Sequence, residues 1–200
     1  MVRSSSFVFL LLAFSAFFWI GCGSGEDQDT LAQPSEAIVP LPEEQDAFWN
    51  ALLAYCGTAY EDTGDQDLVI HFRHCEANEI QIPLHIGDNR SRTWIITRQP
   101  DGLRLKHDHR ERDGSESERT QYGGDTESTG TATRQRFHAD EFTGQLVPHA
   151  IDNVWTIEID PSVPMFAYEL TRDGVEVVVR WEFDLSRPID PPPAPWGYED

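Results

Sequence analysis

The chain has 200 residues, of which 35 are acidic and 15 are Lys or Arg, so its formal net charge at pH 7 is −20. Such a charge repels phosphate backbones and anionic lipid headgroups, which argues against nucleic-acid binding. Hydrophobic residues make up 39% of the chain, and its length fits a single domain with a sizeable core.

The first residues have the layout of a secretory signal. Arg3 precedes an apolar run from Phe7 to Ile20, and small residues follow around Cys22. The run is too short to span a bilayer, which needs about 20 apolar residues. Residues 1–21 are therefore predicted to be a signal peptide that directs export.

Gly21 and Cys22, followed by small and acidic residues, resemble the lipobox of bacterial lipoproteins. The resemblance implies cleavage before Cys22, acylation of that cysteine and attachment to a membrane of the bacterial cell envelope, in the periplasm or on the cell surface. Trp19 stands where lipoboxes usually carry Leu. The alternative is secretion without a lipid, after cleavage near Gly25.

Residues 22–42 are rich in Gly, Ser, Gln, Asp, Glu and Pro and contain few apolar side chains. They bury too little surface to offset the entropy of ordering them, so we expect a flexible acidic tether. Residues 43–200 then form the folded domain. It contains Cys56 and Cys75, an even number in an oxidising compartment, which favours a disulfide. The alternative is a pair of buried free thiols.

One helix is predicted between Pro42 and Cys56. Phe48, Leu52 and Tyr55 recur at helical spacing after an acidic start, and Gly57 supplies the stop.

Beyond Asp67 the apolar pattern changes from the helical period to a period of two, which is typical of strands. We expect about eight of them, at residues 68–73, 79–86, 93–98, 103–110, 129–137, 154–159, 166–171 and 175–183. Short turns, including Gly123-Gly124, join these segments, so neighbouring strands are expected to run antiparallel as a meander. The predicted fold is mainly β: a small lipocalin-like barrel with the helix against one open end.

Two proline-containing segments set limits on this sheet. Pro83 cannot donate a backbone hydrogen bond, which predicts an edge or a bulge at that point of its strand. Residues 188–196 contain five prolines and should run extended over the surface, with Trp196 packing back onto the domain.

Several landmarks together resemble an uncharacterised family of secreted bacterial proteins. They are Phe48–Leu52 (FWNAL), Tyr55–Tyr60 (YCGTAY), Ser91–Trp94 (SRTW), Leu103–Arg110 (LRLKHDHR), Tyr122–Gly124 (YGG), Phe183–Leu185 (FDL) and Pro195–Gly197 (PWG). The resemblance covers nearly the whole predicted domain but implies no activity, because that family has no assigned function.

The most suggestive chemical pattern is His107 and His109. The period of two places both imidazoles on the inward face of one strand, where they could bind one metal ion. A third ligand would have to come from His74, His85, Asp125 or Asp140. Alternatively, the two histidines are polar residues at a wet rim of the barrel.

A second pattern combines cations and aromatic rings. Arg92 lies close to Trp94 and could bind an anionic group at the barrel mouth, although structural ion pairs are the alternative. Trp155, Tyr168 and Trp181 fall on strand positions, where they belong to the core or line an apolar pocket.

No hydrolase elbow, phosphate-binding loop or zinc-protease helix occurs in the sequence, and no cofactor is indicated. The favoured function is an exported binding module that holds a small apolar or amphipathic ligand in a barrel lumen. One alternative is a structural or interaction protein of the envelope, with a solid barrel and an acidic or proline-rich contact surface. The other is a metal-binding protein or enzyme centred on His107 and His109.

Overall fold

The computed structural model describes residues 37–173 and 175–199, which belong to one compact unit that begins at Glu36. The predicted signal peptide, Cys22 and the predicted tether up to residue 36 lie outside the described residues. In the described part, no helix has the length and apolar character needed to cross a membrane.

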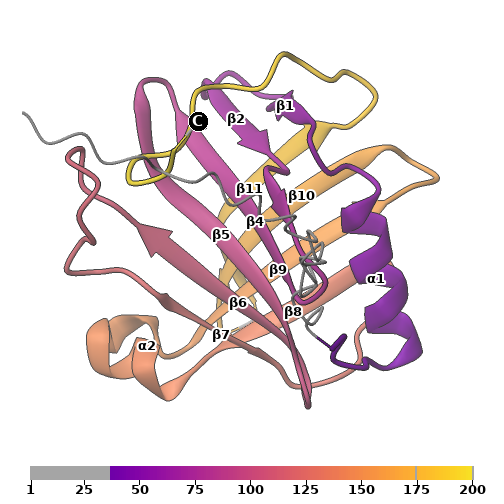
Figure 1. Ribbon diagram of the computed structural model, residues 1–200. Coiled ribbons are helices and arrows are strands. Elements are labelled where there is room, and N and C mark those ends of the chain that lie inside the picture. The colour runs from indigo at the N-terminus through magenta and orange to yellow at the C-terminus, as the bar shows by residue number, and fades with distance from the viewer. Residues whose placement is uncertain (1–36, 174, 200) are drawn as a thin grey trace, which may run out of the picture. The chain divides into compact units, whose positions relative to one another are not determined.

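The domain is one antiparallel sheet with few helices (Figure 1). Its elements in chain order are α1 (Glu43–Leu53), β1 (Ala59–Glu61), β2 (Leu68–His71), β3 (His74–Cys75), β4 (Glu79–Ile86), β5 (Asn89–Gln99), β6 (Gly102–His109), β7 (Tyr122–Thr126), β8 (Arg134–Ala139), α2 (Glu141–Leu146), the 3-10 turn η1 (Pro148–Ala150), β9 (Asn153–Asp160), β10 (Met165–Arg172) and β11 (Glu176–Asp184). Consecutive strands pair along the sheet, except that β2 pairs with β4 and the short β3 lies beside β4.

The sheet closes almost completely on itself. Asp62, just after β1, forms a bridge with Phe183 of β11, and the Thr63 amide donates to the Glu182 carbonyl over 2.8 Å. The prediction of a mainly β, antiparallel meander that forms a barrel is therefore confirmed, with eleven strands in place of about eight. Closure buries the apolar face of most long strands, although Val177 and Val178 of β11 stay exposed, and it leaves few unpaired edges.

The strand expected at residues 129–137 lies at Arg134–Ala139, and the Gly123-Gly124 pair belongs to β7 and not to a turn. A Cβ on Gly123 would lie 2.0 Å from the Leu105 carbonyl oxygen, and one on Gly124 would lie 1.6 Å from the His138 carbonyl oxygen. Only glycine permits the neighbouring backbones to approach this closely. The glycines that read as a turn signal therefore mark close strand packing.

Helix α1 covers the end of the barrel where β5 ends and β6 begins. Phe48, Trp49 and Leu52 are completely buried in the core, as the helical spacing predicts. The buried Gln45 amide donates to Thr126 Oγ1 over 2.9 Å, and Arg98 Nη2 lies 2.8 Å from Asp46 Oδ1. These contacts fix the helix on the end of the sheet and fill that half of the interior.

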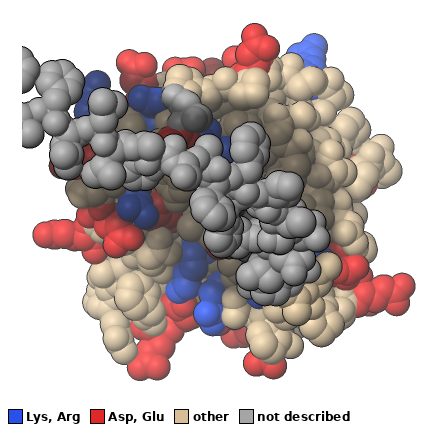
Figure 2. Space-filling view, in the orientation of Figure 1, with Lys and Arg blue, Asp and Glu red and all other residues tan. Residues whose placement is uncertain are grey.

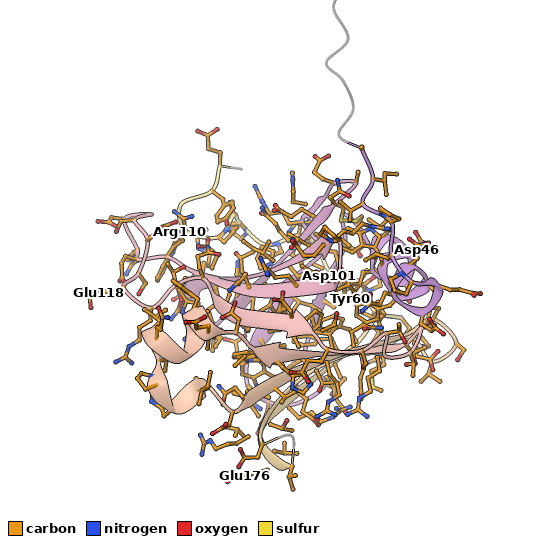
Figure 3. The ribbon with its side chains drawn as sticks, turned by 90° about the horizontal axis from the view of Figure 1, so that it is seen from below. Asp46, Tyr60, Asp101, Arg110, Glu118 and Glu176 are labelled. Carbon is orange, nitrogen blue, oxygen red and sulfur yellow. A yellow bond between two sulfur atoms is a disulfide. The ribbon has the colours of Figure 1, made fainter. Side chains whose placement is uncertain are left out.

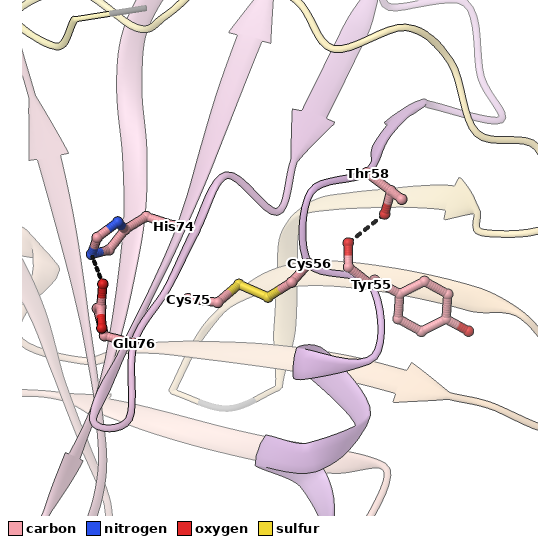
Figure 4. The surroundings of a disulfide bond; sticks show 6 residues. All are labelled: Tyr55, Cys56, Thr58, His74, Cys75 and Glu76. Atoms are coloured by element: carbon pink, nitrogen blue, oxygen red, sulfur yellow. Dashed lines mark hydrogen bonds and ion pairs between the residues drawn. A yellow bond between two sulfur atoms is a disulfide. The ribbon is translucent and has the colours of Figure 1, made fainter. Parts of the chain in front are cut away.

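Cys56 and Cys75 form a disulfide that joins the segment after α1 to β3, with the Cα atoms 6.3 Å apart (Figure 4). The predicted pairing is confirmed over the alternative of free thiols. A cross-link over a loop of this length stabilises the fold by about 3 kcal/mol through the reduced entropy of the unfolded chain.

Pro83 lies inside β4, paired with Thr93 of β5. On its other side, β3 pairs with residues up to Gln81 and β2 pairs from Leu84 onward, so Pro83 stands where the neighbouring strand changes. The β4–β5 register also shifts between Leu84 and Ile86. The missing N–H of proline is tolerated because the ladder is interrupted there.

The segment after β11 runs extended along the domain, as its prolines predict. Ile189 forms a bridge with Ala59, and the Trp196 amide donates to the Arg90 carbonyl over 3.0 Å. The Tyr198 hydroxyl donates to Asp108 Oδ2 over 2.8 Å. The C-terminal segment is therefore attached to the outside of the barrel at several points.

Candidate ligand pocket

The barrel interior is open at the end opposite α1, where a pocket of about 500 Å³ lies. Strands β6, β7, β9, β10 and β11 contribute to it, together with the loop after β6 and the turn after α2. Figure 3 shows Asp46 of α1 on the far side of the molecule from Arg110 and Glu118, which flank that loop. The interior is thus packed near α1 and hollow at the other end.

The pocket has three kinds of lining. Four aromatic side chains line it: Tyr122, Trp155, Tyr168 and Trp181. Aliphatic side chains come from Val147, Ala150, Leu170, Val178 and Val179, and polar ones from His109, Ser117, Arg119, His149 and Asn153. An apolar hollow with a few polar groups at its edge is the usual composition of a small-molecule site.

One aromatic stack leads from the core to the pocket. Tyr168 and Trp181 are direct cross-strand partners on β10 and β11, with ring centroids 5.4 Å apart. The buried Trp94 stacks on Tyr168 at 4.3 Å, with the ring planes 11° apart, and its ring centroid lies 6.3 Å from that of Trp181. Each ring is held by its neighbours, so the stack presents Trp181 to the pocket in a fixed orientation.

A second aromatic group lies beside the first. The His107 ring stacks on Tyr122 at 4.5 Å between centroids, and Trp155 lies 5.1 Å from the same imidazole. His107 itself does not line the pocket; Tyr122 and Trp155 do. The imidazole therefore supports two rings of the pocket wall from behind.

Both nitrogens of His107 are hydrogen-bonded inside the protein. Nδ1 lies 3.1 Å from the Tyr122 carbonyl oxygen, and Nε2 lies 2.9 Å from the Tyr168 hydroxyl. Because a carbonyl can only accept, Nδ1 carries the proton and Nε2 accepts from Tyr168. Burial lowers the pKa of His107 to about 3, so the ring is neutral near pH 7. His107 is thus a structural group with no nitrogen directed at the pocket.

His109 lines the pocket, and its Nε2 lies 3.2 Å from the Tyr122 hydroxyl. Burial, and then the charge of Arg92, lower its pKa to about 4. The two histidines share the inward face, as predicted, but the described residues contain no group of three or more His, Cys, Asp or Glu able to hold a metal ion.

The four residues considered as a third metal ligand are placed elsewhere. Asp125 lies 2.6 Å from Arg104 Nε, Asp140 pairs with Lys106, and His74 lies 3.7 Å from Glu76. His85 lines a separate hollow under the C-terminal segment. A metal-binding role for His107 and His109 remains a prediction without a third ligand in the part of the chain described.

The five residues expected to bind a ligand fall into two groups. Trp155, Tyr168 and Trp181 line the pocket directly, whereas Trp94 lies beneath it in the stack. Arg92 lies opposite His109 across the β5–β6 ladder, at the mouth. Arg92 Nη1 donates a hydrogen bond to Ser91 Oγ over 3.3 Å, and Arg92 forms no ion pair among the described residues.

The pocket residues that come from loops were not predicted from the sequence. Ser117 and Arg119 belong to the loop after β6, and Val147 and His149 to the turn around η1. Their segments carry no periodic pattern, so nothing in the sequence indicated that they meet at the barrel mouth. The short helix α2 lies next to these segments. Asp140 caps it by accepting a hydrogen bond from the Thr143 amide over 2.8 Å.

Comparison of the chain with family models, with curated proteins and with solved structures gives no match. The family resemblance drawn from the sequence landmarks therefore remains a prediction. The pocket itself therefore carries the functional proposal.

Proposed function

We propose that this chain is an exported binding module that holds a small apolar or amphipathic ligand in the open end of its barrel. The pocket of about 500 Å³ and its four aromatic walls carry the proposal. The predicted signal peptide and Cys22 support a location in the bacterial cell envelope, with the domain tethered to a membrane.

The volume and the lining of the pocket are those of a site that binds a small molecule. Ligand sites usually measure about 300–1,000 Å³ and are lined mainly by apolar and aromatic groups. Burial of about 200 Å² of apolar ligand surface would contribute about 5 kcal/mol, at about 25 cal/mol per Å². The loss of ligand motion opposes this gain, so we expect affinities near the micromolar range for small apolar probes.

The rigidity of the walls supports the same proposal. Trp94, Tyr168 and Trp181 stack on one another, and Tyr168 is held by His107. A wall whose side chains are already ordered loses little conformational entropy when a ligand binds. The pocket therefore supplies a preformed aromatic surface.

The test is a fluorescence titration of the purified protein with the neutral probe N-phenyl-1-naphthylamine. Leu170→Trp adds an indole inside the pocket, whereas Val163→Trp adds the same group at an exposed position between β9 and β10. We expect one binding site in the wild type, at least about tenfold weaker binding in Leu170→Trp, and no change in Val163→Trp. A wild-type protein that does not bind the probe would overturn the proposed function.

A further inference from the structure

The charge of the pocket lining differs in sign from that of the whole chain. The chain carries 35 acidic residues against 15 basic ones, and red acidic side chains project around the margin of the face in Figure 2. Yet none of the described residues that line the pocket is Asp or Glu. The lining does contain Arg119, His109 and His149. Carboxylates are thus absent from the described lining of this pocket, although the protein is strongly acidic.

Arg119 is a cation without an anion. It is exposed, it lines the pocket, and it forms no ion pair or side-chain hydrogen bond within the described residues. About half of the described arginines form ion pairs: Arg180, for example, contacts three glutamates, with Glu158 at 2.8 Å. Arg119 is among the described arginines without such a partner, and it is the one of these that lines this pocket.

Arg92 is the second cation at this mouth. It lies opposite His109 in the ladder, on the inward face that it shares with Trp94. Burial and then the positive charge of Arg92 lower the pKa of His109, and the same charge partly opposes the burial that raises the pKa of Tyr122, so its field reaches two residues of the lining. The Ser117 amide donates to the His109 carbonyl over 2.9 Å, which holds the loop that carries Arg119 beside the same strand end.

The nearest carboxylates do not neutralise this corner of the pocket. Asp108 and Glu111 act on His109 in the opposite sense to Arg92. Asp108 is completely buried and lies 2.9 Å from Arg110 Nε, while Glu111 is exposed. Neither lines the pocket, whereas Arg119 does, and Arg92 lies opposite His109 on the adjoining strand.

We propose that the ligand is an amphipathic anion. Its apolar or aromatic body would lie against Trp155, Tyr168 and Trp181, and its carboxylate, sulfonate or phosphate would pair with Arg92 and Arg119 at the mouth. This inference rests on the proposed binding function and adds the charge and orientation of the ligand. Guanidinium groups bind such anions through charge-assisted hydrogen bonds, which are stronger than neutral ones.

The test compares two probes that share one ring system. 8-Anilinonaphthalene-1-sulfonate carries a sulfonate that N-phenyl-1-naphthylamine lacks. We expect the wild-type protein to bind the anionic probe about tenfold more tightly than the neutral one, although the net charge of the protein opposes anions. In Arg92→Gln/Arg119→Gln this preference should disappear, because the affinity for the anionic probe falls about tenfold more than the affinity for the neutral one.

Arg187→Gln is the matched control. It removes one positive charge from an 85% exposed side chain beyond β11, at the α1 end of the barrel, and should leave the preference intact. Displacement of the anionic probe by decanoate but not by decanol would support the proposal with a natural headgroup. Displacement by phosphatidylglycerol vesicles would identify membrane lipid as a source of the same chemistry.

Two results overturn parts of this scheme separately. Equal affinity of the wild type for the two probes would leave the binding function standing and reject the anionic ligand, as would a preference that survives in the double variant. Failure of the wild type to bind either probe would reject the binding function itself.

Discussion

Tyr168 donates its buried hydroxyl to Nε2 of His107 over 2.9 Å, and this hydrogen bond joins the two aromatic groups behind the pocket. The phenol belongs to the stack of Trp94 and Trp181, and the imidazole supports Tyr122 and Trp155. This hydrogen bond, together with those between the Tyr168 side chain and the side chains of Trp94 and Trp155, fixes two walls of the pocket relative to each other.

Tyr168→Phe tests this contact. The substitution keeps the stacked ring but leaves His107 Nε2 buried without a donor, which costs about 1–3 kcal/mol. We expect the free energy of unfolding, measured by urea denaturation, to fall by that amount. Tyr60→Phe, which alters another buried tyrosine in the same core, is the control. An unchanged stability in Tyr168→Phe would contradict the assigned role of the bond.

The stability of the domain should depend on pH through His107. Its pKa is about 3 in the folded protein and 6.5 as the ordinary value, so between these pH values the unfolded chain binds a proton that the folded one does not. The free energy of unfolding therefore decreases as the pH falls through this window, by at most about 1.4 kcal/mol per pH unit for one site. Above pH 6.5 the contribution of His107 is complete.

His107→Gln isolates that contribution from the other titrating groups. The variant should be less stable at pH 7, but its stability should fall less steeply between pH 6 and pH 4 than that of the wild type. His149→Gln alters an exposed histidine and should leave the slope unchanged. Parallel curves for the wild type and His107→Gln would show that His107 does not carry the pH dependence.

The disulfide should stabilise the fold without shaping the pocket. Cys56 and Cys75 lie near the end of α1, whereas the pocket is at the opposite end of the barrel. Cys56→Ser/Cys75→Ser should lose about 3 kcal/mol of unfolding free energy. Reduction of the wild type should produce the same loss, and probe binding should persist in the folded variant. A stability that is insensitive to reduction would contradict this prediction.

Gly124→Ala should be one of the most damaging single changes in the sheet. The added methyl group would lie 1.6 Å from the His138 carbonyl oxygen, so β7 and β8 would have to separate. We expect a loss of about 3 kcal/mol or more, measured by denaturation. Gly57→Ala provides the comparison, because nothing lies within 4 Å of that Cβ and only the positive φ of 82° opposes it. A smaller loss at Gly124 than at Gly57 would contradict the steric argument.

These glycines also show why the sequence predicted the fold better than the site. Residue periodicity identified α1 and most long strands, since each buries one apolar face, and the short links implied the antiparallel order. The same reasoning placed Trp155, Tyr168 and Trp181 on inward positions. It misassigned Gly123-Gly124, because a glycine that permits close strand packing has the same composition signal as a glycine in a turn.

The pocket residues on loops could not be predicted because nothing periodic marks them. Arg119 lies in a stretch of Ser, Glu, Arg and Thr that resembles any solvated loop. Its significance arises from the absence of an acidic partner nearby, which depends on the folded arrangement. Arg92 was identified from its sequence neighbours, yet only its position opposite His109 shows that it lies at the mouth.

Cys22 lies outside the described residues, and its acylation is the prediction on which the cellular location depends. Cells that produce the wild type in the presence of an alkyne-labelled fatty acid should attach the label to the protein, and cells that produce Cys22→Ser should not. Cys56→Ser/Cys75→Ser should still be labelled, because those thiols form the disulfide and do not accept the lipid. Label that persists in Cys22→Ser would assign the lipid to another residue. An unlabelled wild type would favour secretion without an anchor, with the binding domain free to diffuse.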